Sequence, residues 1–416
     1  MRARLLAPLA VALLIAPAAS AGTLSTVLDE PREFLVGYNE GALGDALTLL
    51  AKLDVDVLGK NEQLRLLVVS TRATAQFLAL APADPAVEYV EGNDIVRLAG
   101  AQWNGAQWNG AQWNGAQWNG AQWNGEGGDP GAADQWGLAA TRAPQAWNTT
   151  TGERRAELCV LDSGVAWEHP DLAANVWRGP AGARGFNAID PRQSAYDDAG
   201  HGTHVAGVAA AAVRNGIGGA GVGNVSIMPV KVLGADGTGK EDDLAAGIVW
   251  CADNGADVAL MALSVDEEGP TLRKALDYAA KRDVLLVASA GNTGACTSCV
   301  AYPARDANVV AVSATARDGS LAPFSARGPQ VELAAPGVDI ASTFVGDAYA
   351  SGSGTSQAAA FVAGAAALAR DADPSASARD VRDRLKASAQ DLGSPGKDHS
   401  FGHGLLDVSA LVGGRS

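Results

Sequence analysis

The sequence is poor in positive charge relative to negative charge. It holds 31 Lys and Arg residues against 46 Asp and Glu, and its formal net charge is -15 at pH 7. Such a surface repels phosphates at long range, which excludes non-specific nucleic-acid binding as a default role. Hydrophobic residues still make up 47% of the chain, a fraction typical of a globular protein with a sizeable core. The 416 residues allow two or three domains.

Long hydrophobic runs are also missing. The apolar stretch 5–15 is shorter than the roughly 20 residues that a membrane-spanning helix needs. Arg2 and Arg4 precede it, and the small residues 19–21 follow it. We therefore predict a signal peptide at 1–21, no membrane span, and secretion to the periplasm or the exterior. An uncleaved anchor is the alternative.

Cysteine is scarce, with four residues in the whole chain. Cys296 and Cys299 lie in a loop rich in Gly, Thr and Ser, where a local disulfide is predicted. A zinc site would require a second such pair. Cys159 and Cys251 lie in an apolar strand and an apolar helix, so two buried thiols and one bridge both fit the pattern.

The region 22–99 carries alternating short strand and helix signals, enough for a small α+β unit. The expected strands are 33–38, 64–70 and 87–90, and the expected helices are 43–53 and 74–80.

A perfect five-residue repeat, Ala-Gln-Trp-Asn-Gly, follows five times over at 101–125. A period of five matches neither a strand nor a helix, and Asn-Gly favours turns. We interpret 100–130 as a repeat and Gly-rich linker. The alternatives are tryptophan faces that stack on sugars or a partner, and a folded turn repeat.

From residue 132 onward, continuous apolar strands alternate with helices. This pattern predicts a mainly parallel sheet covered on both faces, with chemistry at the carboxyl ends of its strands. The expected strands are 157–161, 226–233, 257–263, 284–289 and 308–313, and the expected helices are 202–212, 241–254 and 271–281.

Histidine is scarce as well, which narrows the search for a general base. The chain has five, and His201 and His204 share a segment of small residues at 200–207 that is predicted to begin a helix. A metal site at this pair has weak support, because no Glu follows His201 and no third ligand cluster is evident. His201, at the entrance of the helix, is the candidate base.

Two further residues fit the same chemistry. Asp162 follows the expected strand 157–161, where its carboxylate could orient an imidazole, although alone it also fits a turn. Ser356 lies in the first turn of an Ala-rich helix that is apolar all round and therefore buried. A helix start offers N–H groups to a developing oxyanion, although a simple Ser cap would look the same.

Asp162, His201 and Ser356 occur in the chain order of the subtilisin triad. With these three motifs, the sequence resembles the subtilisin-like serine protease family, the subtilases, over nearly all of residues 133–412. Further matching motifs are Asp162-Ser163-Gly164, His169-Pro170-Asp171-Leu172, Ser289-Ala290-Gly291-Asn292, Ala335-Pro336-Gly337 and Gly402-His403-Gly404.

The resemblance implies an α/β fold of three layers with a mainly parallel central sheet, in a catalytic domain at 131–416. It also implies a ferredoxin-like α+β propeptide at 22–99 that assists folding and inhibits the enzyme. The implied function is a secreted serine endopeptidase that works through an acyl-enzyme, is made as an autoprocessed zymogen and needs no cofactor for catalysis. Its implied partners are polypeptide substrates and its own propeptide. The competing hypothesis is an inactive subtilase-fold protein that presents the Trp repeats to glycans or surfaces.

By the same resemblance, Asp162 orients His201, His201 takes the proton of Ser356, and Asn292 with the Ser356 backbone N–H forms the oxyanion hole. An extended substrate would pair with two backbone edges. These edges are Gly237, Thr238 and Gly239 on one side and Ala262, Leu263 and Ser264 on the other.

Several residues depart from the family pattern. Ser264 stands where Gly is usual and is expected to narrow the groove, and Ala301 and Ala304 replace common glycines, so a shallow primary pocket is predicted. The acidic run 266–268 fits either a preference for basic substrate residues or a solvated turn. Near the nucleophile, Gln357, Ala360 and Phe361 replace the usual Met, Pro and His.

Calcium is suggested by resemblance alone. Asp171 and the loop around Asn215 match the family's strong calcium site, in which carboxylate and carbonyl oxygens surround the ion. A matching Gln ligand near the mature N-terminus is not evident in the sequence.

Overall fold

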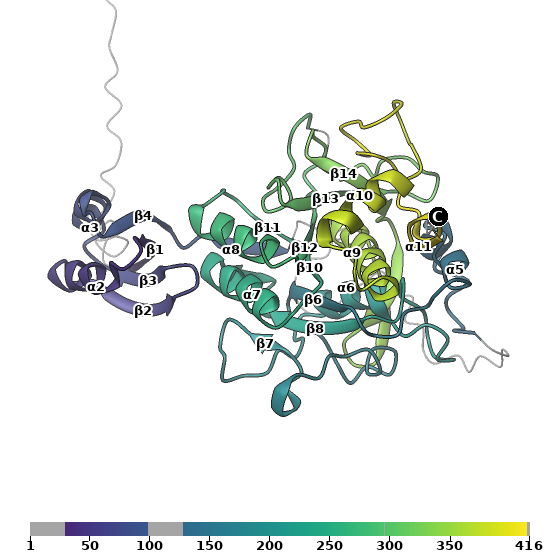
Figure 1. The fold of residues 1–416 in the computed structure, drawn as a ribbon, viewed down its shortest axis with the longest axis horizontal. Coiled ribbons are helices and arrows are strands. Elements are labelled where there is room, and N and C mark those ends of the chain that lie inside the picture. Colours follow the sequence, from purple (N-terminus) through teal and green to yellow (C-terminus); the bar gives the residue numbers. More distant parts are fainter. Residues whose placement is uncertain (1–29, 99–127, 295, 414–416) are drawn as a thin grey trace, which may run out of the picture.

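The structure is a computed structural model that describes residues 30–98, 128–294 and 296–413 (Figure 1). The predicted signal peptide and the five repeats lie outside the described residues. Within the described ranges, no helix combines the length and the apolar character needed to cross a membrane.

The N-terminal unit is a four-stranded antiparallel sheet with two helices on one face (Figure 1). Its strand order is β2-β3-β1-β4 and its element order is βαββαβ, which does not conflict with the expected ferredoxin-like propeptide. Phe34 and Val36 of β1 point into a core with the helices, whereas Leu35 between them joins the core of the rest of the molecule. The elements are β1 (Arg32–Tyr38), α2 (Leu43–Lys52), β2 (Asp56–Asn61), β3 (Leu66–Thr71), α3 (Thr74–Leu80) and β4 (Val87–Gly92).

A seven-stranded parallel sheet forms the centre of the larger unit, which confirms the predicted architecture. Its strands are almost entirely buried because helices cover both faces. In spatial order they are β14 (Val331–Pro336), β13 (Val309–Thr315), β12 (Leu285–Ser289), β10 (Val258–Met261), β6 (Glu157–Asp162), β8 (Ser226–Lys231) and β7 (Phe186–Asn187).

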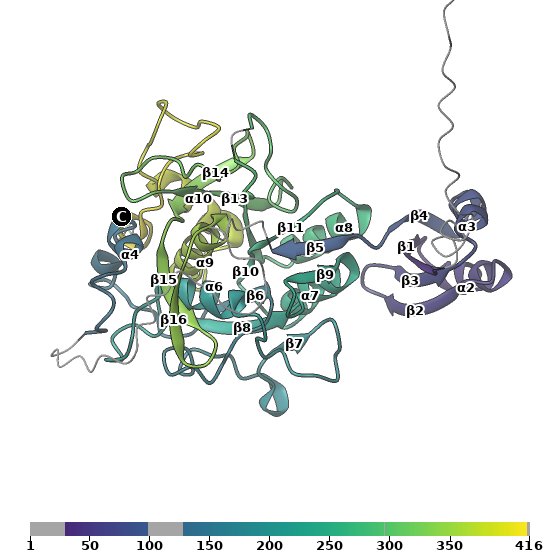
Figure 2. The same cartoon turned by 180° about the vertical axis from the view of Figure 1, so that it is seen from behind.

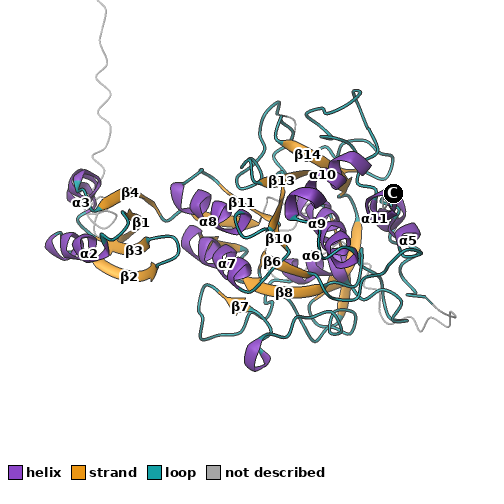
Figure 3. Cartoon of the chain, viewed as in Figure 1, coloured by secondary structure: helices purple, strands orange, loops and turns teal. Residues whose placement is uncertain are grey.

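Alternation along β6 shows how the two faces are divided. Leu158 and Val160 belong to the core under the helices α6 (His201–Ala210) and α9 (Thr355–Ala372). Cys159 and Leu161 belong to the core under α7 (Glu241–Asp253) and α8 (Pro270–Ala280). Figure 3 shows the resulting helix–sheet–helix layers. Four further helices add to the α6 and α9 side, namely α4 (Trp136–Ala140), α5 (Ala143–Ala146), α10 (Ala378–Ser388) and α11 (Val408–Gly413).

Two disulfides are present among the described residues. Cys296 pairs with Cys299, as predicted. Cys159 pairs with Cys251, so the bridge is the correct one of the two alternatives, and it ties β6 to α7.

A small antiparallel sheet joins the two units (Figure 2). Strand β5 (Ile95–Leu98), which continues from the N-terminal unit, lies between β9 (Thr238–Lys240) and β11 (Leu263–Val265). The single strand expected at 257–263 is therefore wrong in detail, because the chain leaves the parallel sheet after Met261 and then pairs with β5. A hairpin of β15 (Ile340–Phe344) and β16 (Ala348–Gly352) leads into α9.

Candidate active site

Asp162 and His201 meet at the carboxyl edge of the parallel sheet. Asp162 is the last residue of β6, His201 is the first residue of α6, and both are buried. His201 Nδ1 lies 2.9 Å from each carboxylate oxygen of Asp162. Burial lowers the pKa of His201, but the facing carboxylate outweighs burial, and the net effect raises that pKa.

Small and polar residues bring the helix this close to the strand. A Cβ at Gly202 would lie 2.0 Å from the carbonyl oxygen of Gly164, so only glycine fits there. The Gly202 amide donates to Ser163 Oγ at 2.9 Å, and the Ser163 hydroxyl donates to Asp197 at 2.8 Å. Asp197 also accepts the Thr203 amide at 2.8 Å, so it caps the first turn of α6.

Sequence reasoning missed the supporting roles of Ser163 and Asp197. The available signal was an acidic residue four positions before the predicted helix start at His201. Lys231 was missed too. Its ammonium group donates to the Ser163 carbonyl at 2.8 Å and so fixes the turn that follows Asp162.

The second nitrogen of His201 is set up as an acceptor. In the neutral imidazole, the nitrogen that faces the carboxylate, Nδ1, carries the proton, and the lone pair lies on Nε2. That Nε2 atom is buried and finds no hydrogen-bond partner among the described residues. A buried polar atom without a partner costs about 1 to 3 kcal/mol, so such atoms gather where a substrate or a reacting group will supply the bond.

Ser356 lies in the first turn of α9, as predicted, and is fully buried. Its hydroxyl donates to the Ala262 carbonyl at 3.2 Å, immediately after β10. In this structure the Ser356 hydroxyl is therefore paired with the Ala262 carbonyl and not with His201. The predicted contact between Asp162 and His201 is present, and the proton transfer from Ser356 stays a prediction.

Asn292 is held against the start of α9. Its side-chain oxygen accepts the Thr355 amide at 2.9 Å and the Thr355 hydroxyl at 3.0 Å. These two bonds fix the orientation of the amide group. A Cβ at Gly354 would lie 3.2 Å from Asn292 Nδ2, so glycine at 354 keeps the space beside that nitrogen open.

The predicted substrate edges hold a strand of this same chain. Leu98 and Arg97 of β5 pair with Leu263 and Ser264, and Arg97 also pairs with Thr238 on the other side. The Leu98 amide donates to the Gly237 carbonyl at 3.1 Å, and Gly239 pairs with Val96. Although Ser264 is expected to narrow the groove, an extended strand fits in it, since Arg97 of β5 pairs with Ser264.

Comparison with known proteins decides the family. The model of the Subtilase family matches residues 154–404. An alkaline protease of Alkalihalobacillus alcalophilus is 34% identical over 414 residues, covering 96% of this chain and 97% of that protein. Subtilisin BL of Lederbergia lenta is 42% identical over 278 residues, which are 67% of this chain and 98% of that protein. This chain belongs to the subtilase family.

A solved structure of a longer chain has the same fold. Fervidolysin from Fervidobacterium pennivorans, described as a keratinolytic enzyme related to subtilisin, matches with a TM-score of 0.76 and 27% sequence identity. The match covers 92% of this subtilase but 61% of the fervidolysin chain. By class, the subtilase is a subtilisin-like serine endopeptidase.

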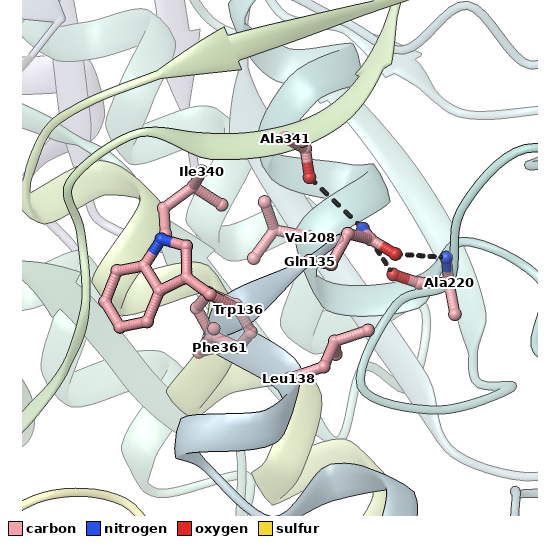
Figure 4. Close-up of a pocket in the computed structure, with 9 residues that line it drawn as sticks. Gln135, Trp136, Leu138, Val208, Ala220, Ile340, Ala341 and Phe361 are labelled. Carbon is pink, nitrogen blue, oxygen red and sulfur yellow. Dashed lines mark hydrogen bonds between the residues drawn. The ribbon is translucent and has the colours of Figure 1, made fainter. Parts of the chain in front are cut away.

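Phe361, one of the departures from the family pattern beside the nucleophile, has a packing role in this subtilase. Phe361 lies on the face of α9 toward α4, and a Cβ at Gly137 would lie 2.5 Å from its ring. Figure 4 shows Phe361 with Trp136 and Leu138 around a small apolar hollow. Beside it, the Gln135 side chain bonds the backbone of Ala220 and Ala341. Phe361 thus anchors α4 to the helix that carries Ser356 and supplies no catalytic group.

The expected shallow pocket rests on two alanines. A Cβ at Gly291 would lie 3.2 Å from the Ala301 Cβ, so the Ala301 methyl group takes up room beside Gly291. Ala304 is buried nearby in the chain, and the intervening Tyr302 carbonyl accepts the Val265 amide at 2.8 Å. The pocket's preference for small residues stays a prediction.

Asp171 and Asn215 do lie together, as expected for the calcium site. The Asp171 carboxylate, however, accepts bonds from the Asn215 side-chain amide at 2.7 Å, the Gly219 amide at 2.9 Å and the Tyr349 hydroxyl at 3.0 Å. Burial raises the pKa of Asp171 to about 6 despite these donors. In this arrangement hydrogen-bond donors face the carboxylate, and calcium coordination by Asp171 and Asn215 stays a prediction.

Proposed function

We propose that this subtilase is a secreted serine endopeptidase, made as a zymogen that processes itself, in which Asp162, His201 and Ser356 carry the chemistry. The observation that supports it most is the buried Asp162–His201 pair, whose outer nitrogen has a lone pair and no partner among the described residues. Ser356, at the start of a helix beside the end of β10, supplies the hydroxyl.

In the proposed reaction, the Ser356 hydroxyl turns from the Ala262 carbonyl and attacks the substrate carbonyl carbon. His201 Nε2 takes its proton, and Asp162 stabilises the resulting imidazolium. Collapse of the tetrahedral intermediate breaks the C–N bond, and His201 returns the proton to the leaving amine. Water then attacks the acyl-enzyme with His201 as base. The ester C–O bond breaks, His201 returns the proton to the Ser356 oxygen, and the acid product is freed. Besides the peptide and water, the proposed steps use these three side chains and the donors of the oxyanion hole.

The oxyanion would be held by two donors. The Asn292 amide, oriented by Thr355, is one, and the Ser356 backbone N–H at the helix start is the other. Both belong to rigid, buried parts of the molecule, which keeps their reorganisation cost low.

The N-terminal unit would act as the inhibitory propeptide. Its last described strand, β5, occupies both substrate edges and runs antiparallel to β11. Continuing this register by one position reaches Ala262, whose carbonyl accepts the Ser356 hydroxyl. We therefore expect processing at the peptide bond that follows Ala99, in keeping with a pocket that accepts small residues.

The test is to express the full chain and follow processing on a gel, with N-terminal sequencing of the product. The Ser356→Ala variant is expected to remain full length beyond signal removal. The matched control Ser351→Ala, at an exposed serine on β16, should process like the wild type. Processing of Ser356→Ala at the same bond, in a host without other proteases, would contradict the proposal and favour the inactive binding protein.

The residues 1–21 and the two disulfides support export to an oxidising compartment. Structural calcium at Asp171 and Asn215 stays a prediction, and no step of the reaction uses it. A melting temperature that falls with a chelator would support the ion, and an unchanged one would contradict it.

A further inference from the structure

Strand β5 lies in the proposed substrate cleft as a bound peptide would. The contacts of its side chains therefore show which residues of the cleft face each position of such a peptide. Val96 is fully buried in the core that includes Leu263 and Leu272. Arg97, one residue later, points to the opposite side because strand side chains alternate. There its guanidinium forms an ion pair with Asp266, just beyond β11.

Asp266 depends on this one partner. Within the described parts of the chain, its only salt bridge is to Arg97. Glu268 in the same turn has partners within the catalytic unit, since Arg273 and Arg305 both face it. When β5 leaves the cleft, Glu268 keeps its cations and Asp266 loses its counter-ion.

The acidic turn repels a negative charge on the same segment. Asp94 lies just before β5, and its pKa is raised by burial and then by repulsion from Glu267 and Asp266. The acidic turn thus attracts a cation and repels an anion along one bound segment. A turn that is merely solvated would make no such distinction between charges, so this turn fits a role in recognising the bound segment.

We propose that Asp266 is a specificity-determining residue that selects Arg or Lys at the substrate position held by Arg97. This position pairs with Ser264 and, given cleavage after Ala99, lies two residues before the residue that donates the scissile carbonyl. The inference rests on the proposed function. It assigns the acidic turn 266–268 to substrate recognition through one carboxylate.

The test uses processed enzyme and three quenched fluorescent peptides that share Val at the Val96 position, Leu at the Leu98 position and Ala before the scissile bond. They differ in Arg, Ala or Glu at the Arg97 position. We expect kcat/KM for the Arg peptide to exceed that for the Ala peptide by about two- to five-fold at low salt, the range of a partly exposed ion pair. The Glu peptide should be slowest, and the differences should shrink at high salt.

Two variants make the result specific. Asp266→Asn should bring the Arg-to-Ala ratio of kcat/KM close to one. Asp134→Asn removes the same charge at an exposed site just before α4, and should keep the wild-type ratio. Figure 2 shows α4 and β5 in separate parts of the molecule. An equal rate on all three peptides, or a preference that persists in Asp266→Asn, would overturn the inference. Failure to cleave even the Ala peptide would instead count against the proposed function.

Discussion

The active centre and the contact with the N-terminal unit are held together by different forces. At the centre, Asp162 and His201 are 0% and 1% exposed and are locked by short directional bonds. At the contact, Lys240 bonds both carboxylate oxygens of Glu33 with its side chain 50% exposed, beside an apolar patch that includes Leu35. Exposed ion pairs each add about 0 to 1 kcal/mol. The centre is thus held by buried hydrogen bonds, whereas the contact includes weaker, exposed ion pairs.

Two carboxyl groups with raised pKa values also lie at the contact with the N-terminal unit. Glu91 of β4 and Glu241 of α7 both accept amides at the start of α8, from Thr271 at 2.9 Å and Leu272 at 3.2 Å. Burial, and then repulsion from Glu91, raises the pKa of Glu241 to about 8. Burial also raises the pKa of Glu91. Two carboxyl groups from opposite sides thus share one helix start.

The largest effect is expected at the centre. Asp162→Asn keeps the shape of the side chain but removes the charge that fixes the His201 tautomer, and the rate should fall about 10⁴-fold. The readout is the rate at which full-length chain is processed. A loss below ten-fold would show that His201 does not depend on this partner.

The oxyanion donor should matter somewhat less. Asn292→Leu removes the amide but keeps a similar volume, and kcat should fall about 10²- to 10³-fold, as is typical for one such donor. KM for a peptide substrate should change little, because the donor acts on the transition state. A rise in KM at constant kcat would place Asn292 in ground-state binding.

At the contact, alkaline pH should loosen β5. A carboxyl group whose pKa is raised in the closed form stabilises that form fully below its ordinary value of 4.5. For Glu241 this stabilisation is lost as pH rises toward about 8. Asp94 and Asp242, which also face Glu241, act in the same direction.

Hydrogen exchange in full-length Ser356→Ala measures this opening. Protection factors of the β5 amides, corrected for intrinsic exchange, should fall at least about ten-fold between pH 5 and pH 9. Glu241→Gln should flatten the pH dependence, whereas Glu153→Gln, at an exposed distant site, should not. An unchanged slope in Glu241→Gln would contradict the role of this carboxyl group.

The smallest effect is expected from an exposed ion pair. Lys240→Met removes the partner of Glu33 and should lower β5 protection by no more than about five-fold, and less at high salt. A loss as large as that caused by pH would mean that the exposed pairs hold the contact, and the comparison drawn above would fail.

The sequence predicted the parts whose signals are local. The apolar runs of β6, β8 and β12 identify the parallel sheet, and Asp162, His201 and Ser356 lie in motifs that can be recognised one at a time. The edge strand β2 went unpredicted because its residues are mostly exposed and lack an apolar pattern.

Other features depend on partners far away in the chain. Strand β5 pairs with β9 and β11, which lie more than a hundred residues away in the chain. Nothing in the sequence of Ile95–Leu98 indicates which strands it will pair with. The bond from Ser356 to Ala262 and the capping role of Asp197 are likewise products of the folded arrangement. Short polar residues near turns look alike in sequence until their neighbours are known.

The most direct test of the triad is to map the site of labelling by a fluorophosphonate probe in processed protein by mass spectrometry. The account predicts one labelled residue, Ser356, and loss of the label when His201→Ala is processed in trans by a trace of wild-type enzyme. Labelling at another serine, or undiminished labelling of Ser356 in His201→Ala, would contradict it.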